Sequence, residues 1–221
     1  MKVRPSGVYA LLDTQIIRGR DPGALAVAAA RGGASTLQLR AKTASTREFV
    51  ALAQAVRDAL VNTRVPLIIN DRVDVALAVG ADGVHLGRDD MEPALARNLL
   101  GPAALIGVTI KNTADVDRLA AFGADVVDHG CIGGVFATRH KDNPDAPLGL
   151  DGFAHVLCYA RAHLGNIPIG AIAGISADNA GALTSTGCDF VAVVGAIFDA
   201  DDVTSATRAL LTATRQSGRP T

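Results

Sequence analysis

The chain has 221 residues, a formal charge of -1 and 49% apolar residues, which is enough for one large core or two small domains. The near-neutral charge and the lack of any Lys/Arg run longer than two residues argue against a nucleic-acid surface. The longest apolar runs are strand-sized, well short of the roughly 18 residues that a membrane helix requires.

The apolar pattern predicts strands and helices that alternate along the whole chain. Strands are predicted at 8–13, 36–40, 67–70, 83–87, 105–110, 126–132, 167–173 and 190–197. Helices are predicted at 24–30, 46–62, 73–79, 93–100, 114–122, 151–164, 177–186 and 202–215. Four similar triplets separate a helix from the next strand, as expected of helix C-terminal caps: Gly33-Ala34-Ser35, Gly80-Ala81-Asp82, Gly123-Ala124-Asp125 and Gly187-Cys188-Asp189.

Eight strand–helix units in one uninterrupted chain favour an α/β fold of the (β/α)8 TIM barrel type, with residues 1–221 forming a single domain. We expect the ends, residues 1–7 and 216–221, to be flexible. An open, doubly wound sheet is the alternative, although that fold does not by itself require eight units.

The cysteines are odd in number and widely spaced, at Cys131, Cys158 and Cys188, with no C-x-x-C pair. This usage predicts three ordinary buried thiols in a reduced, cytoplasmic protein.

Two acidic residues follow neighbouring strands in the segment Val65–Asp90. Asp71 comes directly after the strand at 67–70, and Asp90 closely follows the strand at 83–87. A strand, a short helix and a second strand form a parallel βαβ unit, so both carboxylates belong at one sheet edge, on strands about 4.8 Å apart. Two such charges about 4 Å apart repel by roughly 4 kcal/mol at an effective dielectric near 20. A Mg²⁺ ion that carries a phosphorylated substrate would relieve this repulsion.

Other polar or small residues are predicted at the same edge of the barrel. Gln38 and Arg40 share one face of their strand, and Lys42 continues just beyond its end. Gly174 and Gly195 follow the last two strands, where barrels of this type bind phosphate through backbone N–H groups.

The loop 133–150 has no periodicity and is long enough to be a functional lid.

Each of the candidate site residues also has a purely structural explanation. Asp71 could cap its helix, the Asp89-Asp90 pair could cap the following turn, and Arg40 and Lys42 could be solvated loop charges. The glycines could serve turns or packing, and a core position is the simplest explanation of His85 and Cys158.

Six motifs in this order and spacing resemble the thiamine-phosphate synthase family over essentially the whole chain. They are Gln38-Leu39-Arg40-Ala41-Lys42, Asn70-Asp71, His85-Leu86-Gly87-Arg88-Asp89-Asp90, Gly107-Val108-Thr109, Val135-Phe136-Ala137-Thr138 with Lys141, and Ala171-Ile172-Ala173-Gly174-Ile175 with Val193-Val194-Gly195. The resemblance implies a transferase that couples 4-amino-2-methyl-5-(diphosphooxymethyl)pyrimidine to 4-methyl-5-(2-phosphooxyethyl)thiazole, or its carboxylate. Thiamine phosphate and pyrophosphate would be the products.

The resemblance also implies a role for each matching residue. Asp71 and Asp90 would bind Mg²⁺, and Arg40, Lys42 and Lys141 would neutralise the leaving diphosphate. The remaining substrate-binding positions would be Gln38, Asn70, Thr109, Thr138, His140, Ala173, Gly174, Val194 and Gly195.

Several positions depart from the family pattern. Arg88 replaces a glutamine, Thr109 a serine, His140 the second threonine of a T-x-T-K motif, and Gly195 a serine. About three extra residues also lie within the segment 126–131.

Two other functions are weighed against the synthase. A thiazole tautomerase-like isomerase has the same fold, but that branch tends to lack the acid after the asparagine and the acidic pair after the fourth strand. A non-catalytic regulatory or ligand-binding barrel would explain the departures at Arg88, His140 and Gly195. In each case the expected partners are small molecules rather than nucleic acid or membrane, and a homo-oligomer is left open.

Overall fold

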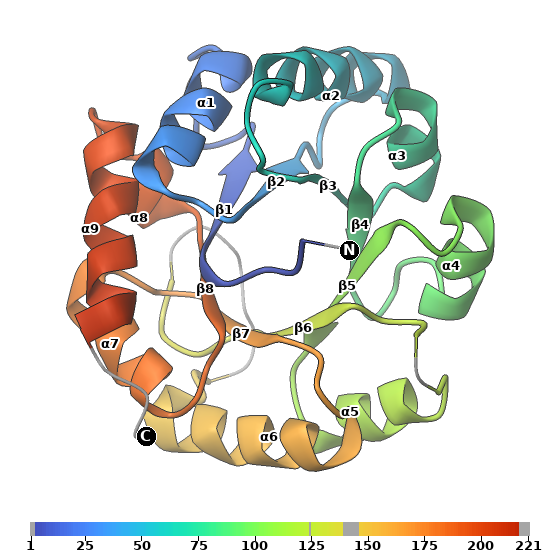
Figure 1. The fold of residues 1–221 in the computed structure, drawn as a ribbon, viewed down its shortest axis with the longest axis vertical. Helices are drawn as coiled ribbons and strands as arrows, with labels where there is room; N and C mark the ends of the chain where they lie inside the picture. The colour runs from blue at the N-terminus through green and yellow to red at the C-terminus, as the bar shows by residue number, and fades with distance from the viewer. Residues whose placement is uncertain (1–2, 124, 139–145, 217–221) are drawn as a thin grey trace.

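Eight parallel strands close into a barrel in the computed structural model, which describes residues 3–123, 125–138 and 146–216 (Figure 1). The strands, each paired with its neighbours in chain order, are β1 (Gly7–Asp13), β2 (Thr36–Arg40), β3 (Leu67–Asn70), β4 (Gly83–Leu86), β5 (Leu105–Ile110), β6 (His129–Ile132), β7 (Ile169–Ile172) and β8 (Phe190–Val193). Closure occurs between β1 and β8, where Gly7 pairs with Phe190. The predicted TIM barrel is therefore confirmed, and an open doubly wound sheet is excluded.

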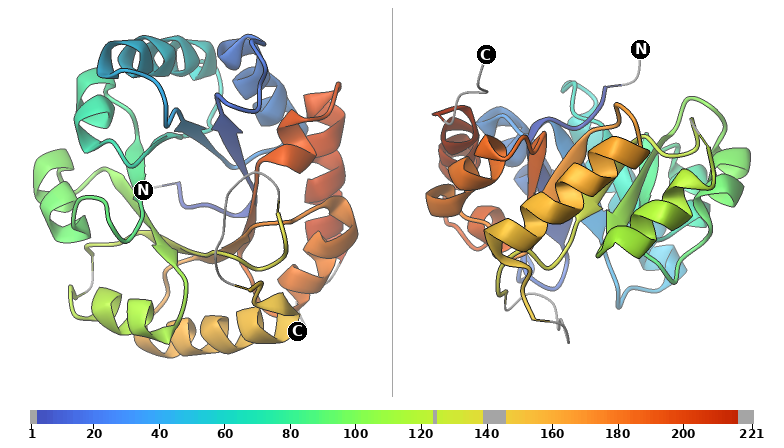
Figure 2. Two further views of the ribbon diagram at one scale, coloured as in Figure 1. Left: turned by 180° about the vertical axis from the view of Figure 1, so that it is seen from behind. Right: turned by 90° about the horizontal axis from the view of Figure 1, so that it is seen from below.

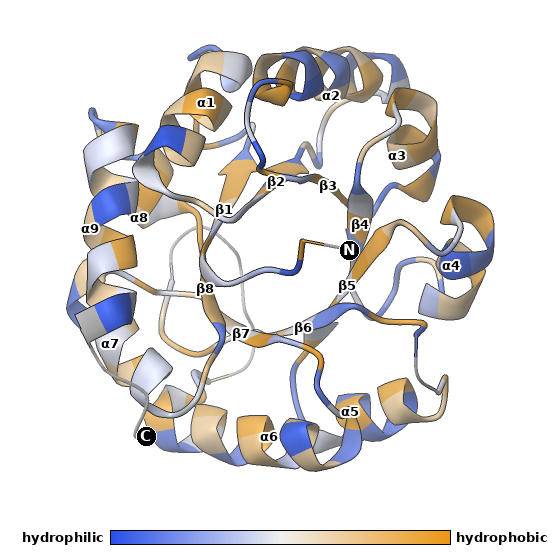
Figure 3. Cartoon of the chain, in the orientation of Figure 1, coloured by the Kyte–Doolittle hydropathy of each residue, from blue (hydrophilic) through white to orange (hydrophobic). Residues whose placement is uncertain are grey.

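Helices surround the barrel and present their apolar faces to it, as the colouring in Figure 3 shows. They are α1 (Pro22–Gly32), α2 (Thr46–Leu60), α3 (Val73–Val79), α4 (Pro93–Leu100), α5 (Thr113–Ala120), α6 (Gly149–His163), α7 (Ala177–Ser185), α8 (Gly195–Phe198) and α9 (Val203–Gln216). Within the described ranges, none of these helices is long and apolar enough to cross a membrane.

Local sequence signals set the helix boundaries. Asp21 caps α1 by accepting hydrogen bonds from the Gly23 and Ala24 amides, and Ser45 forms a capping box with Glu48 at α2. The glycines of the four triplets all adopt the left-handed backbone conformation that ends a helix without a Cβ clash, with φ values from 63° to 101°.

Aspartates that directly precede β4, β6 and β8 dock these three helix–strand junctions onto a neighbouring strand. Asp82 Oδ2 accepts the Leu67 amide, Asp128 Oδ2 the Ile106 amide and Asp189 Oδ2 the Ile169 amide, each at 2.8 Å. The third triplet ends at Asp125, but the aspartate that docks onto the neighbouring strand is Asp128, three positions later. The prediction of a strand from residue 126 was therefore wrong, because β6 begins only at His129.

The last strand is shorter than predicted. The run 190–197 is apolar throughout, but β8 ends at Val193, and Gly195 begins the short helix α8. The Phe198 amide bonds to the Val194 carbonyl at 2.9 Å, which closes this helical turn. Periodicity cannot separate strand from helix in so short an apolar run.

Buried side chains form two clusters. The larger lies between the barrel and its helices, and the smaller fills the barrel interior with Tyr9, Ile68, Leu105, Cys131, Phe190 and Ala192. Glycine makes room for the interior rings, since a Cβ at Gly170 would lie 2.2 Å from the Phe190 ring. The barrel is thus a packed core below its open end rather than a pore.

The two ends of the barrel differ. Residues leading into β1 cross the opening in Figure 1, whereas residues 133–138, which follow β6, lie at the opposite end in the side view of Figure 2. Much of the sequence predicted to be flexible, residues 1–2 and 217–221, lies outside the described residues, while Gly7 is already the first residue of β1.

The cysteine prediction was correct for two of three residues. All three thiols are free, and Cys131 and Cys188 are buried. Cys158 is exposed on α6, so its predicted core position was wrong.

Candidate active site

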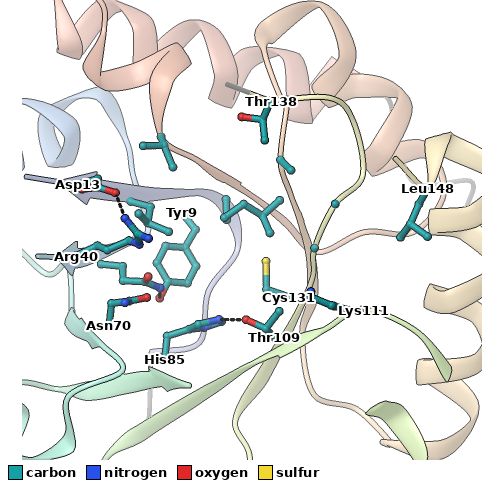
Figure 4. A pocket seen from close by; sticks show the side chains of 18 of the residues that line it. Tyr9, Asp13, Arg40, Asn70, His85, Thr109, Lys111, Cys131, Thr138 and Leu148 are labelled. Carbon is teal, nitrogen blue, oxygen red and sulfur yellow. Dashed lines mark hydrogen bonds and ion pairs between the residues drawn. The ribbon is translucent and has the colours of Figure 1, made fainter. Parts of the chain in front are cut away.

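A cavity opens at the carboxyl ends of the strands, where the charged candidates were expected. Seven of the predicted site residues line it: Gln38, Arg40, Asn70, Thr109, Thr138, Ala173 and Val194. Figure 4 shows side chains from different strands pointing into this space, with Tyr9 near its centre and Thr138 on the far wall. The closed barrel therefore brings together residues that lie up to 156 positions apart in the chain (194 minus 38).

The floor of the cavity contains buried polar groups. Tyr9 is buried, and its hydroxyl accepts a hydrogen bond of 2.9 Å from Gln38 Nε2. Burial raises the pKa of the Tyr9 hydroxyl, which therefore stays protonated at neutral pH. The Gln38 amide is thus held with its nitrogen toward Tyr9, and its side chain is fixed below the opening.

A neutral histidine packs beside this floor. His129 is fully buried between the rings of Tyr9, Phe190 and His85, at centroid distances of 5.6 to 5.9 Å within the group. Neither of its ring nitrogens has a hydrogen-bond partner among the described residues. Burial lowers the pKa of His129 to about 3, so the imidazole is uncharged.

Arg40 is held in place by a buried acid that the sequence patterns did not single out. The Asp13 carboxylate pairs with the Arg40 guanidinium, and the two residues are opposite each other at the ends of β1 and β2. Asp13 also accepts the Gln15 amide at 3.0 Å. A guanidinium anchored on one side keeps its other donors for a ligand in the cavity.

His85 was expected to be a core histidine, and it is buried, but it also lines the cavity. Its Nε2 lies 3.0 Å from the Thr109 hydroxyl, which comes from the adjacent strand (Figure 4). Thr109 thus has a fixed orientation at the cavity wall.

The two acids chosen from the sequence meet beside the cavity. Asp71 and Asp90 are joined by a side-chain hydrogen bond, and Lys42 Nζ forms an ion pair with Asp71 Oδ2. Burial, and then the hydrogen bond to Asp71, raise the pKa of Asp90. These three residues lie outside the set that lines the cavity itself.

Asp71 has a strained backbone rather than a capping role. Its φ of 64° is in the left-handed region, which non-glycine residues seldom adopt. Arg72 occupies the N-cap position of α3, and no side chain caps that helix. The explanation of Asp71 as a helix cap was therefore wrong, and its conformation instead directs the carboxylate toward Lys42. Backbone strain of this kind is common at functional sites.

Asp90 helps to close a turn, which is close to the structural role considered for it from the sequence. Its Oδ2 accepts the Gly87 amide at 2.7 Å, and the Asp90 amide returns to the Gly87 carbonyl at 3.4 Å. Both ends of the turn are thereby closed, and the position of the carboxylate is defined.

The opposite side of the mouth is lined by small residues. Gly174 and Gly195 line a pocket that shares Thr138, Ala173 and Val194 with the main cavity. Ala173 and Gly174 both have positive φ, of 97° and 66°. A Cβ at Gly174 would lie 2.4 Å from the Ala137 carbonyl oxygen, so glycine is required there.

Two predicted residues, His140 and Lys141, lie outside the described residues, as does the rest of the segment 139–145. Cavity-lining residues that were missed include Tyr9, Asp13 and Lys111. Residues two apart on β1 face the same side, so the period of two would have placed Tyr9 and Asp13 together once β1 was assigned.

A closed (β/α)8 barrel, with a polar cavity at the carboxyl ends of its strands and an acid pair with a lysine beside it, defines the class: an α/β-barrel enzyme. Comparisons with known proteins specify the family. A family profile described as thiamine monophosphate synthase matches residues 8–197. The chain is 50% identical over 198 residues to the thiamine-phosphate synthase of Agrobacterium fabrum, covering 90% of this chain and 89% of that one. It is 46% identical to the thiamine-phosphate synthase of Chloroflexus aurantiacus, over 92% and 90% of the two chains.

A solved structure agrees with these sequence matches. Thiamine phosphate pyrophosphorylase from Pyrococcus furiosus superposes with a TM-score of 0.82 at 30% identity, covering 98% of this chain and 97% of that one. The chain belongs to the thiamine monophosphate synthase family.

Proposed function

We propose that this chain is a thiamine-phosphate synthase. It couples the pyrimidine diphosphate to the thiazole phosphate and releases thiamine phosphate and pyrophosphate. Family membership and the 50% identity to a relative of that name support this activity. The structural observation that carries it is the meeting of Asp71 and Asp90 beside Lys42, next to a cavity lined by Arg40.

The residues present fit a Mg²⁺ ion. Asp71 and Asp90 are close enough to hydrogen-bond, and two such carboxylates are both ionised only at a cost that a divalent cation removes. In the described parts of the chain, no group of three or more His, Cys, Asp or Glu side chains gathers at one point. Mg²⁺ is usually bound by one or two protein carboxylates, while phosphate oxygens and water fill its remaining coordination positions. When bound, the ion would supply positive charge to the diphosphate.

The chain's own cations act on the leaving group. The C–O bond to the diphosphate breaks with its electron pair going to oxygen, and the thiazole nitrogen forms the new C–N bond. Arg40, Lys42 and Lys141 are the cations we assign to the growing charge on the diphosphate, an electrostatic role. Gln38 and Asn70 line the cavity beside Arg40 and are assigned to the pyrimidine diphosphate.

The small-residue side of the mouth is assigned to the thiazole half. Backbone amides around Gly174 and Gly195 would hold its phosphate, with Ala173 and Val194 in the same wall. Thr138 lines both cavities and would contact the phosphate or carboxylate of the thiazole. Thr109 would donate a hydrogen bond from the neighbouring wall. His140 would replace the hydroxyl of the second threonine in the T-x-T-K motif.

The reaction needs no side-chain nucleophile, and the cavity offers a poor one. Cys131 lines the cavity but is almost fully buried, and burial raises the pKa of its thiol. A neutral thiol is a weak nucleophile, so a covalent enzyme intermediate is not part of the proposal.

The alternatives differ in what they require. An isomerase that acts on the thiazole alone has no use for the Asp71–Asp90 pair, which is present here. A non-catalytic barrel would bind ligands without releasing pyrophosphate.

The test is to measure pyrophosphate with both substrates, each substrate alone, and with Mg²⁺ removed by chelation. Release only with both substrates and Mg²⁺ supports the synthase, whereas no release with both substrates and Mg²⁺ present rejects it. A cytoplasmic location and a homo-oligomeric state stay predictions.

A further inference from the structure

Asp115, on the first turn of α5, joins two loops at the rim of the candidate site. Its Oδ1 accepts hydrogen bonds from Arg88, at 3.1 Å from Nε and 2.6 Å from the terminal nitrogen. Its Oδ2 accepts the backbone amide of Lys111 at 2.8 Å. One carboxylate therefore uses one oxygen for the loop after β4 and the other for the loop after β5.

Neither loop is remote from the proposed chemistry. Arg88 lies inside the turn that Gly87 and Asp90 close at both ends, so holding Arg88 restrains the position of the Asp90 carboxylate. Lys111 lines the cavity at the carboxyl end of β5.

Asp115 is not needed as the cap of its own helix. Asn112 is the N-cap of α5, and its side chain accepts the Asp115 amide at 3.1 Å. Asp115 is only 3% exposed, although its partner Arg88 is about half exposed. A buried carboxylate whose oxygens both accept hydrogen bonds has one favoured position, whereas a surface ion pair by itself contributes little.

We propose that Asp115 is a positioning residue, which acts through Arg88 to hold the Asp90 turn in the geometry that binds Mg²⁺ together with a diphosphate. Arg88 supplies the link between Asp115 and this turn. A guanidinium reaches Asp115 with two donors, which fixes the turn more firmly than a single amide could. The inference rests on the proposed function, because it assigns Asp90 to the metal–diphosphate site.

The chain offers a matched control at the other end of the barrel. Asp128 is 4% exposed, accepts the Ile106 amide at 2.8 Å and pairs with Arg97 at 2.5 Å. It therefore has the same chemistry as Asp115, but at the amino ends of β5 and β6 rather than at the carboxyl ends. Asp128→Asn should reduce stability much as Asp115→Asn does, without changing the site.

The test is the affinity for pyrophosphate in the presence of excess Mg²⁺, measured by titration calorimetry on the full chain without turnover. Asp115→Asn and Arg88→Met should each weaken this affinity roughly tenfold, and the double variant should be no weaker than either alone, because both changes break one connection. Arg88→Lys should recover only part of the affinity, since lysine keeps the positive charge but lacks the paired N–H donors of the guanidinium. KM for the thiazole phosphate should stay within about twofold of the parent value, because the change is confined to the metal–diphosphate side.

Parental Mg²⁺–pyrophosphate affinity in a folded Asp115→Asn variant would overturn the inference, as would an equal loss in Asp128→Asn. In either case, turnover by the parent with both substrates would leave the proposed function standing. If instead the parent releases no pyrophosphate from both substrates with Mg²⁺, the proposed function itself fails.

Discussion

Asp71 and Asp90 share a hydrogen bond although both are acids, and Lys42 is paired with the first of them. The two residues follow the two strands of one βαβ unit, Asp71 directly after β3 and Asp90 in the turn after β4. Two carboxylates in this arrangement are stable only if one keeps a proton or a cation joins them.

Asp71→Asn should lower turnover at least about 100-fold while the fold persists, because the amide has no charge to offer a metal ion. Asp71 caps no helix, and its ion pair with Lys42 is partly exposed, so the cost to stability should be small. Pyrophosphate release and thermal unfolding would be measured together. Asp74→Asn, which breaks the neighbouring exposed pair with Arg72, is the matched control and should leave turnover unchanged. Parental turnover in Asp71→Asn would show that Asp71 is not an essential ligand.

Asp90→Asn should raise the melting temperature of the metal-free protein at pH 7 to 8 while it abolishes activity. The folded pKa of Asp90 is raised above its unfolded value, so the unfolded state gives up this proton first as pH rises. The parent is therefore stabilised at low pH and loses that stability as pH passes through the raised pKa, whereas the Asn variant has no such loss. Melting curves from pH 4 to 8 with chelator would show it. An identical pH dependence in both proteins would mean that the two acids do not interact.

Acid should destabilise the protein partly through His129. Its folded pKa is about 3, against an unfolded value of about 6.5, so below pH 6.5 the unfolded state takes up a proton that the folded state refuses. Stability is fully present above pH 6.5 and falls toward pH 3, at up to about 1.4 kcal/mol per pH unit. Urea unfolding of the parent and of His129→Leu, at pH 7 and pH 5, isolates this contribution. The parent should lose up to about 2 kcal/mol more than the variant over that interval. An equal loss would contradict a neutral buried His129.

Gly174→Ala should raise KM for the thiazole phosphate at least about tenfold. The new Cβ would lie 2.4 Å from the Ala137 carbonyl oxygen, so it would displace the backbone there together with the adjacent Thr138. KM for the pyrimidine diphosphate should change far less. Gly80→Ala is the control: its φ of 63° is close to the 66° of Gly174, but nothing lies within 4 Å of its Cβ. That variant should cost about 1 kcal/mol of backbone strain and leave both KM values alone. Equal effects of the two variants on KM would mean that the Gly174 wall does not bind substrate.

The sequence was sufficient for the barrel because its signals were local and repeated. Capping residues such as Asp21 and glycines such as Gly80 mark helix ends by direct backbone contacts. A short apolar run between two such ends is enough to indicate a strand. One strand boundary was misplaced because the docking aspartate, Asp128, lies three positions after the triplet that ends at Asp125.

The site was predictable as far as its residues sit at strand ends. Arg40 and Asn70 are the last residues of β2 and β3, and they reach the cavity for that reason. Asp13 was missed because its importance lies in a partner 27 residues away on the next strand. The left-handed backbone of Asp71 leaves no trace in composition or periodicity, since the residue type gives no warning of its φ.

The role of Asp71 and Asp90 in metal binding is tested most simply by pyrophosphate release from the full chain with both substrates, followed as Mg²⁺ is titrated into chelated enzyme. We expect no release without the ion, release that rises to saturation with it, and no response in Asp71→Asn. Release at the full rate without a divalent ion, or an unaltered response in the variant, would contradict the claim that these two acids hold the metal.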